Sequence, residues 1–308
     1  MKLNELLNQK KSLFEEVAQK YGFSCSYISN NVFEFKKEEK RIFIDNFVWP
    51  SNSASSVAIT NDKALAHTLL KKNQIPSVEQ IVLNIQDSNI YEKAVSFFEI
   101  ANKHVVLKPN ASSGGKDVYF CEHDKDLFFR TFSSLITKFG VVNISKKVDV
   151  VNEYRCVFLH DKVEMIYLKR RPVVVGDSKS SLLSLLLRHQ YKFIKLKAGL
   201  SEKLNTIPKK GEVVQLTDQD NHGIGCTEEI QSRDSELFPA LEQLAAKAAK
   251  VLGLELCTVE ILLDESGSLF VMEIYPAPQL EAVAIQNNKG MKRCLELYRK
   301  TLSFTLET

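Results

Sequence analysis

The sequence predicts an α+β protein whose subdomains follow one another along the chain. Apolar residues recur at helical spacing in several stretches, among them residues 3–21, 125–138 and 235–252. Other stretches alternate or run apolar over the length of a strand and are joined by short turns, which indicates hairpins. Helices mixed with antiparallel hairpins are typical of the α+β class.

The first part of the chain predicts a helix, two strands and a linker. The helical spacing over 3–21 stops at Gly22, a residue that commonly ends helices. Strands are expected over 26–35 and 41–48, joined by a charged turn. The Ser-rich segment 50–56 has the composition of a linker.

The middle and C-terminal parts alternate between strands and helices. In order, we expect a helix over 61–72, a strand over 79–83, a helix over 91–103, a strand over 104–108, a polar loop over 109–116, a strand over 117–121, a helix over 125–138 and strands over 141–144, 154–160 and 162–169. Residues 180–192 look helical, whereas 197–232 are polar and irregular. The helix over 235–252 has a wide apolar stripe, and we expect it to pack on the sheet that holds the C-terminal hairpin.

Composition excludes several classes of function. At 308 residues, the chain is long for one compact core and suggests two or three subdomains. Its 41 basic and 38 acidic residues are too balanced to predict a nucleic-acid surface. Six cysteines and six histidines lack metal-ligand spacing, so we expect reduced, mostly buried thiols and no zinc site. The N-terminus has no apolar signal core and no stretch approaches a membrane span, so we expect a cytoplasmic protein.

The hairpin expected over 256–275 holds two glutamates in apolar surroundings. If the turn sequence Asp-Glu-Ser-Gly over 264–267 forms the loop, Glu260 faces Val271, and Glu273 lies on the same face. The two glutamates then sit on a diagonal with Cα atoms roughly 7–8 Å apart. Like charges at that separation repel unless a cation lies between them, and two carboxylates suit Mg²⁺ shared with a substrate phosphate. Two solvated glutamates on an exposed face are the alternative.

The loop 108–117 lies between two strands and contains a short run of small residues. These are Ser112, Ser113, Gly114 and Gly115. Such residues let successive backbone N–H groups approach an anion, and Lys108 would add a positive charge. The loop is not a Walker loop, because it opens a strand and lacks Gly-Lys-[Ser/Thr]. A glycine-rich turn without a ligand is the other interpretation.

The order of several motifs resembles the ATP-grasp ligases. They are Asp62-Lys63 at the start of a helix ending in Leu69-Leu70, Gln74-Ile75-Pro76, Val106-Leu107-Lys108-Pro109, the Ser/Gly loop, Asn152-Glu153-Tyr154-Arg155 and the two-glutamate hairpin followed by Pro276-Ala277-Pro278. The stretches 169–180 and 208–225 resemble the cyanophycin synthetase branch, which is related to bifunctional glutathione synthetases and ribosomal-protein glutamate ligases. The resemblance covers roughly residues 55–280, and the piece before it is much shorter than the usual preceding domain.

This resemblance implies an ATP-grasp fold, in which two α+β subdomains grip ATP between antiparallel sheets, with a shortened N-terminal α/β domain. The implied domains are a reduced N-terminal domain over 1–57, a small subdomain over 58–150 with the phosphate flap 108–117, and a large subdomain over 151–308 with the metal hairpin 256–275.

The resemblance also implies roles for individual residues. Lys63 and Lys108 would contact the phosphates of ATP from two sides, beneath the flap of Ser112, Ser113, Gly114 and Gly115. The remaining roles are the adenine border for Lys147, Val148 and Val150, the ribose hydroxyls for Glu153, Mg²⁺ for Glu260 and Glu273, the acyl phosphate and its carboxylate for Arg171 and Arg155, and the acceptor site for the loop around Asn221. For each basic residue, a solvated side chain is the alternative.

Three positions depart from the pattern of these ligases. Tyr275 stands where an asparagine usually follows the second metal glutamate, and Gln279 replaces a glycine. The segment 145–147, Ser-Lys-Lys, lies near the hinge where an acidic residue is expected. Without the asparagine oxygen, a second Mg²⁺ would lose a ligand unless Tyr275 or a water molecule takes its place.

The implied function is that of an ATP-dependent carboxylate–amine ligase, an ADP-forming C–N ligase. It would form an amide or peptide bond through an acyl phosphate and release ADP and phosphate. Its ligands would be ATP, one or two Mg²⁺ ions with Mn²⁺ as a substitute, and an amino acid or peptide. A nucleotide-binding module with impaired catalysis is the alternative, followed by a small-molecule kinase. We expect neither nucleic acid nor membrane as a partner, and a homodimer is the default for a soluble enzyme.

Overall fold

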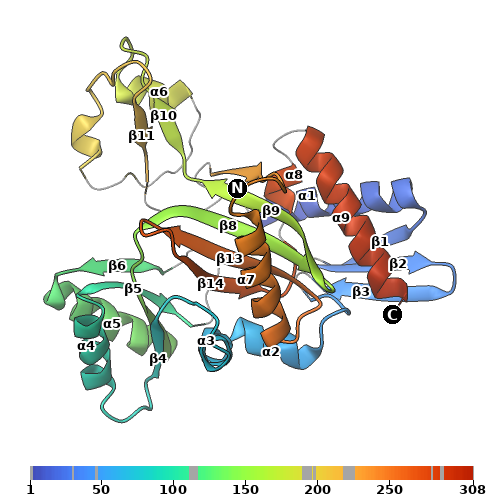
Figure 1. The fold of residues 1–308 in the computed structure, drawn as a ribbon, viewed down its shortest axis with the longest axis horizontal. Coiled ribbons are helices and arrows are strands. Elements are labelled where there is room, and N and C mark those ends of the chain that lie inside the picture. Colours follow the sequence, from blue (N-terminus) through green and yellow to red (C-terminus); the bar gives the residue numbers. More distant parts are fainter. Residues whose placement is uncertain are drawn as a thin grey trace.

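The computed structural model describes residues 3–29, 31–45, 48–110, 117–188, 196, 199–217, 226–278, 280–284 and 288–307. Within this part of the chain, a five-stranded antiparallel sheet lies at the centre of the molecule (Figure 1). A four-stranded sheet, a three-stranded sheet and a projecting lobe surround it. This mixture of helices and antiparallel sheets is the α+β class that the sequence predicts.

The N-terminal unit is a helix packed on a three-stranded antiparallel sheet. Its elements are α1 (Leu3–Tyr21), β1 (Ser24–Ser29), β2 (Val32–Lys37) and β3 (Lys40–Asp45). The single strand expected over 26–35 is wrong, because β1 and β2 form a hairpin in which Ser29 lies opposite Val32. Two asparagines stand at 30–31, and asparagine is a common turn residue.

Two short helices follow, and the first begins within the segment that the sequence suggested as a linker. They are α2 (Ala54–Asn61) and α3 (Lys63–Lys72). The linker expected over 50–56 is wrong in its second half, because Ser53 is the N-cap of α2 and its hydroxyl accepts from the backbone N–H of Ser56. The expected helix over 61–72 is α3, whose N-cap Asp62 accepts from two backbone N–H groups.

The four-stranded sheet carries helices on one face. Its elements are β4 (Gln80–Asn84), α4 (Ile90–Ile100), β5 (His104–Pro109), β6 (Tyr119–Glu122), α5 (Lys125–Phe139) and β7 (Val141–Lys146), with strand order β4-β7-β5-β6. Phe98 of α4 and Phe128 of α5 stack at 4.4 Å and pack against Leu107 and Ile144 of the sheet. The opposite face therefore stays available to face the central sheet.

The central sheet has strand order β12-β9-β8-β13-β14. Its strands are β8 (Val150–Leu159), β9 (Lys162–Arg170), β12 (Thr227–Ile230), β13 (Leu256–Asp264) and β14 (Leu269–Tyr275). Helix α7 (Phe238–Val251) covers one face, where Leu241 and Ala248 pack with Val259 and Ile261 of β13. The predicted packing of this helix on the sheet that holds the hairpin is confirmed.

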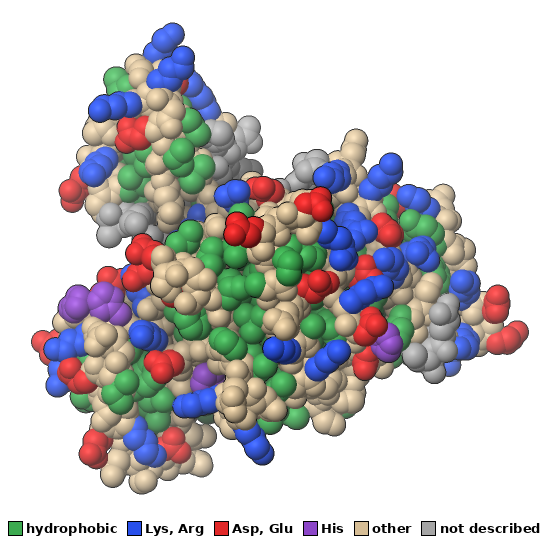
Figure 2. Space-filling view, in the orientation of Figure 1, with side chains coloured by type: hydrophobic (Ala, Val, Ile, Leu, Met, Phe, Trp, Pro, Cys, Tyr) green, Lys and Arg blue, Asp and Glu red, His purple; other side chains and the backbone are tan. Residues whose placement is uncertain are grey.

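A small lobe projects from the central sheet after β9 (Figure 1). It contains β10 (Val173–Val175), α6 (Leu182–Arg188), the 3₁₀ turn η1 (Ser201–Lys203) and β11 (Val213–Gln215). Its own core includes Val174, Leu182 and Leu216, and several Lys and Arg side chains lie around the edge of its visible surface (Figure 2). The helix expected over 180–192 is α6, and its final residues lie outside the described part. The irregular segment expected over 197–232 is wrong where β11 and β12 form.

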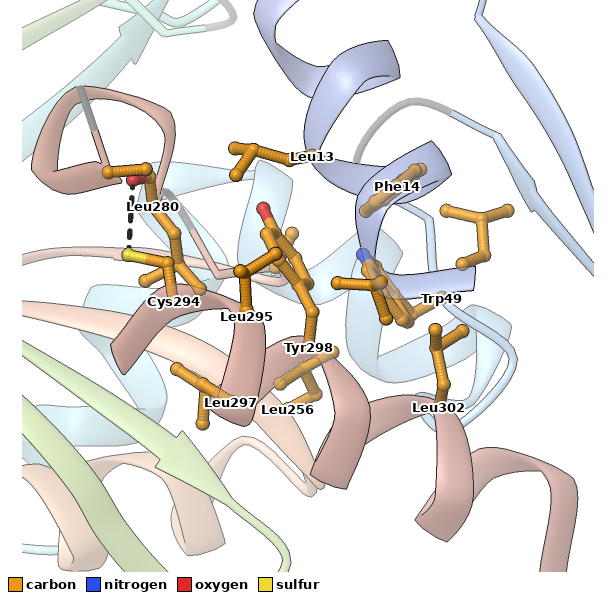
Figure 3. Close-up of a cluster of buried hydrophobic side chains, with 14 of the residues drawn as sticks. Leu13, Phe14, Trp49, Leu256, Leu280, Cys294, Leu295, Leu297, Tyr298 and Leu302 are labelled. Carbon is orange, nitrogen blue, oxygen red and sulfur yellow. Dashed lines mark hydrogen bonds between the residues drawn. The ribbon is translucent and has the colours of Figure 1, made fainter. Parts of the chain in front are cut away.

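The second face of the central sheet is covered by α1, α8 (Glu281–Ala284) and α9 (Asn288–Glu307). Sequence reasoning did not predict α9. Figure 3 shows Tyr298 of α9 beside Phe14 and Trp49 in the cluster of buried side chains. The rings of Tyr298 and Trp49 stack at 6.1 Å, and the ring of Phe14 meets both nearly at right angles. The C-terminal helix thereby joins the N-terminal unit to the central sheet.

Other expected elements are present, with ends shifted by a few residues. All six cysteines are free thiols, five buried and Cys25 half-buried, which confirms the expectation of reduced thiols. Of the helices in the described ranges, none is both long enough and apolar enough to cross a lipid bilayer. The domain limits at 57 and 150 stay a prediction.

Candidate functional site

One face of the central sheet changes from apolar to charged along its strands. Side chains alternate along β8, so Val157 and Leu159 share a face with Glu153 and Arg155. The first two belong to the core beneath α9, whereas the charged pair is buried beyond it. The strand registers add further polar residues to this face: Lys169 of β9, Glu228 of β12, Glu260 of β13, and Glu273 and Tyr275 of β14.

The two glutamates of the hairpin lie directly opposite each other. The diagonal arrangement predicted from the turn is wrong, because Leu263 pairs with Leu269 rather than Ser268 and the register shifts again between Glu260 and Ile261. Val271 pairs with Ile261 and Glu273 pairs with Glu260, so Met272 is the extra residue of a β-bulge. Directly opposed residues have Cα atoms about 4.5–5.5 Å apart, closer than on a diagonal. The carboxylates therefore repel more strongly than expected and need a proton or a cation between them.

Tyr275 supplies a proton at this point. Its hydroxyl lies 3.1 Å from Oε2 of Glu260 and 3.1 Å from Oε2 of Glu273. Burial raises the pKa of the phenol well above its usual value, and both carboxylates raise it further. The hydroxyl therefore stays protonated at neutral pH and acts as a hydrogen-bond donor.

Lys63 reaches the carboxylate pair from helix α3, of which it is the first residue. Its Nζ lies 3.0 Å from Oε1 of Glu273. The preceding residue, Asp62, also accepts from the side-chain amide of Asn110, which follows β5. This contact ties the start of α3 to the base of the predicted phosphate flap.

Lys108 reaches the same carboxylates from β5 of the four-stranded sheet. Its side chain is buried, with 7% of the residue exposed. Burial lowers its pKa, Glu273 and Glu260 oppose the shift, and Lys63 adds to it. The lysine thus lies within electrostatic range of three charged groups from α3, β13 and β14. The two sheets meet at this charged cluster.

Arg155 links the carboxylate pair to the rest of the charged face. Its Nη2 lies 3.4 Å from Oε2 of Glu260, and its Nε lies 3.5 Å from Oε1 of Glu153. Burial opposes ionisation of Glu260, but Arg155 and then Lys169 outweigh it and lower the pKa of that carboxyl to about 2. Despite burial, the carboxylate of Glu260 raises the pKa of the guanidinium well above its usual value. Both groups are charged at neutral pH.

Lys169 and Glu228 extend this network, and sequence reasoning gave neither a role. The Nζ of Lys169 lies 3.0 Å from Oε1 of Glu153, and Glu228 is its neighbour across β12–β9. Both side chains are buried. Lys169 lies on the same face of β9 as Met165 and Tyr167, which belong to the core. That shared face is the signal that the charged residue at 169 points inward.

Other predicted site residues lie on other elements of the fold. Arg171 lies half-buried between β9 and β10, at the base of the projecting lobe. Lys147 and Val148 lie on the connection between β7 and β8, where the ammonium of Lys147 pairs with Glu122. Val150 begins β8 opposite Asp264. The following predicted or divergent residues lie outside the described part: Ser112, Ser113, Gly114, Gly115, Asn221 and Gln279.

The donor set of the hairpin fits a hard divalent cation. No group of three or more His, Cys, Asp or Glu that could hold a metal is found in the described residues. Mg²⁺, however, is commonly held by one or two carboxylates together with substrate phosphates. Glu260 and Glu273, facing each other across a strand pair, supply that number, and the nearby lysines suit the phosphates.

The comparisons agree with this geometry at the level of the fold. The chain matches no family model, and no curated protein is similar enough to count as a match. Among solved structures it is similar to a bifunctional glutathione synthetase from Pasteurella multocida, with TM-score 0.63 and 19% identity over 95% of this chain. It spans 44% of that protein, less than half of its length.

A second similarity is to the D-alanine–D-alanine ligase of Bacillus anthracis, with TM-score 0.54 and 16% identity over 83% of this chain and 72% of that one. The same ligase complexed with ATP gives TM-score 0.52 and 17% identity, over 83% and 71% of the two chains. The chain therefore has the ATP-grasp fold and resembles the ATP-grasp ligases.

Proposed function

We propose that the chain is an ATP-dependent carboxylate–amine ligase that acts on an amino acid or peptide. The observation that carries the proposal is the meeting of Lys63, Lys108, Glu260 and Glu273, which come from a helix and two different sheets. Two ammonium groups and a carboxylate pair are what a triphosphate with a divalent cation requires. The similarity to a glutathione synthetase and a D-alanine–D-alanine ligase is consistent with amide-bond formation.

The reaction would proceed through an acyl phosphate. An oxygen of the substrate carboxylate attacks the γ-phosphorus of ATP, and ADP leaves. The amine of the second substrate then attacks the carbonyl carbon, phosphate leaves, and the amine loses a proton. Activation is necessary because oxide is a poor leaving group, whereas phosphate is a good one.

The residues of this chain would contribute charge and position. Lys108, buried near both carboxylates, would hold a phosphate from the side of the four-stranded sheet. Lys63 would exchange its contact with Glu273 for a phosphate oxygen. A bound divalent cation would offset the negative charge on the transferred group. Arg155 would keep Glu260 ionised and in place, because the two are paired within the buried network.

The direct test is release of ADP in the presence of a panel of amino acids and short peptides. Lys108→Ala and Glu273→Gln should each lower turnover at least tenfold. Two matched exposed positions serve as controls: Lys72→Ala on the same helix as Lys63, and Glu265→Gln in the turn of the same hairpin. Both controls should keep full turnover. Turnover that survives loss of Lys108 or Glu273 would show that the site lies elsewhere.

A nucleotide-binding module without catalysis is the second candidate, and the position of Tyr275 favours it. The hydroxyl bridges the two carboxylates, so it occupies oxygens that a metal ion would otherwise use. This candidate predicts stabilisation by ATP and Mg²⁺ in a thermal melt with no turnover for any acceptor. Detection of an amide product by mass spectrometry would exclude both this candidate and a small-molecule kinase.

A further inference from the structure

The hydroxyl of Tyr275 occupies the space between the inner oxygens of the carboxylate pair. It lies 3.1 Å from Oε2 of Glu260 and 3.1 Å from Oε2 of Glu273. The guanidinium carbon of Arg155 lies 5.4 Å from the centroid of its ring, which holds the ring against one side. A phenol carries one proton, so it donates to one carboxylate at a time while its oxygen faces the other.

The oxygens of the pair are already divided among partners. Oε2 of Glu260 meets both Tyr275 and Nη2 of Arg155. Oε2 of Glu273 meets Tyr275, and its Oε1 meets Nζ of Lys63. A cation cannot occupy the position of the hydroxyl proton, because the two would repel. The oxygens that Tyr275, Arg155 and Lys63 leave for a cation are Oε1 of Glu260 and, once Lys63 turns to a phosphate, Oε1 of Glu273.

One oxygen from each carboxylate is enough for one cation but not for two. Metal–oxygen bonds to Mg²⁺ are about 2.0–2.1 Å long, so two ligand oxygens on one ion lie about 3 Å apart. In two-metal sites the ions lie about 3.5–4 Å apart, and each needs its own set of oxygens. With both Oε2 atoms turned toward Tyr275, the pair lacks the second set.

We propose that Tyr275 limits the hairpin to a single divalent cation, bound on the Oε1 side of Glu260 and Glu273 together with the nucleotide. The proposal rests on the proposed function only in that a nucleotide supplies the phosphates. The tyrosine acts here as a spacer and hydrogen-bond donor between the carboxylates. It is not a ligand of the cation.

The contrasting arrangement has the phenol oxygen as a third ligand. The hydroxyl would then have to turn its proton away from both carboxylates. Tyr275→Phe separates the two arrangements, because it keeps the ring beneath Arg155 and removes only the oxygen. A spacer can be lost without loss of the ion, whereas a ligand cannot.

The test counts Mn²⁺ ions bound per chain by electron paramagnetic resonance, in titrations with a non-hydrolysable ATP analogue at saturating concentration. The wild-type protein should bind one ion, and Tyr275→Phe, which frees both Oε2 atoms, should keep that ion with affinity within threefold. Tyr275→Asn replaces the hydroxyl donor with an amide oxygen and should bind two ions. Tyr275→Gln is a second variant with the same amide, in case the shorter side chain unfolds the hairpin.

Two ions in the wild-type protein would overturn the proposal, as would a loss of more than tenfold in Mn²⁺ affinity for Tyr275→Phe. One ion in both amide variants, with the analogue still bound, would overturn it as well. The count is independent of turnover. A protein that binds one Mn²⁺ and ligates no acceptor would leave the proposal standing and refute the proposed function, whereas an active protein with two ions would do the opposite.

Discussion

Replacement of Arg155 by methionine should destabilise the protein strongly. Methionine keeps much of the aliphatic volume and removes the charge that faces Glu260 and Glu153 at 3.4 and 3.5 Å. Glu260 is 8% exposed, so water cannot replace the lost partner. Breaking one side of a buried ion pair costs about 3–5 kcal/mol, because the other charge stays buried without compensation.

The pKa of Glu260 leads to a similar magnitude for the loss of unfolding free energy. Burial raises the pKa of this carboxyl, yet Arg155 and Lys169 bring it from 4.5 to about 2 in the folded protein. Each pKa unit corresponds to about 1.4 kcal/mol, so the network contributes about 3 kcal/mol at neutral pH. A lowered carboxyl pKa stabilises the fold above the unfolded value near 4.5 and loses that effect as the pH falls toward 2. In Arg155→Met, the guanidinium no longer counters the effect of burial, so the pKa of Glu260 rises.

Urea denaturation followed by circular dichroism at pH 7 and pH 4.5 would measure this effect. The loss of unfolding free energy in Arg155→Met should be largest at pH 7 and smaller at pH 4.5, where Glu260 takes up a proton in the variant. Arg170→Met is the matched control, because Arg170 lies on the neighbouring strand β9 and pairs with Glu229 in an exposed position. Exposed pairs contribute about 0–1 kcal/mol.

A double-mutant cycle with Glu260→Gln completes the measurement. If the two side chains act as a buried pair, the second substitution should cost much less in the presence of the first. Additive losses would refute the reasoning. So would a loss below about 1 kcal/mol for Arg155→Met, which is the range of exposed pairs.

Three further outcomes follow from the same contacts. In the absence of nucleotide, Mn²⁺ should bind poorly by calorimetry, and Lys63→Ala should tighten it because Glu273 loses its ammonium partner; unchanged affinity would count against that pairing. Asn52→Ala removes four hydrogen bonds to the backbone at the two ends of the hairpin. It should lower the free energy of unfolding by about 3 kcal/mol in a denaturant titration. A loss below about 1 kcal/mol would show that water replaces these bonds. Ser53→Ala removes the cap of α2 and should cost about 1 kcal/mol, with Ser55→Ala, an exposed serine inside that helix, as a near-neutral control.

The sequence predicted the elements with strong periodicity, and it predicted that the charged residues of the site belong together. Helix α7 has a wide apolar stripe, and its packing on the sheet followed from that stripe. The hairpin β13–β14 followed from two apolar arms around an Asp-Glu-Ser-Gly turn. Both signals are local, so a single sequence contains them.

The alternation of apolar and polar residues does not predict the register of the hairpin. The turn and the alternation predict an unbroken ladder in which Leu263 faces Ser268, whereas Leu263 pairs with Leu269 and the bulge at Met272 shifts Glu273 by one further residue. The sequence of β14 does not mark this bulge, because the strand is apolar from Leu269 to Met272 and has no alternation there to interrupt. The turn and the bulge together decide whether the two carboxylates meet face to face or diagonally.

Polar composition misled the prediction twice. The serines of 50–56 suggested a linker, although Ser53 caps a helix and Asn52 is buried beneath the hairpin. The polar stretch 197–232 suggested loops, although Glu228 lies on a buried strand beside Lys169. In both cases the polar side chain satisfies backbone groups or a partner charge, which composition cannot distinguish from exposure to water.

The charge balance of the site bears on how a nucleotide would enter it. Arg155 and Lys169 already face Glu260 and Glu153, and Lys63 faces Glu273. A triphosphate adds negative charge to this network, so a cation must leave a carboxylate to meet it. Lys63 is the cation at the edge of the network, since it stands at the start of a helix rather than within the sheet. On the proposed function, its departure would leave Glu273 without that ammonium, and a divalent cation would take its place. Each exchange offsets the loss caused by the other, so nucleotide and metal should bind together more tightly than either binds alone.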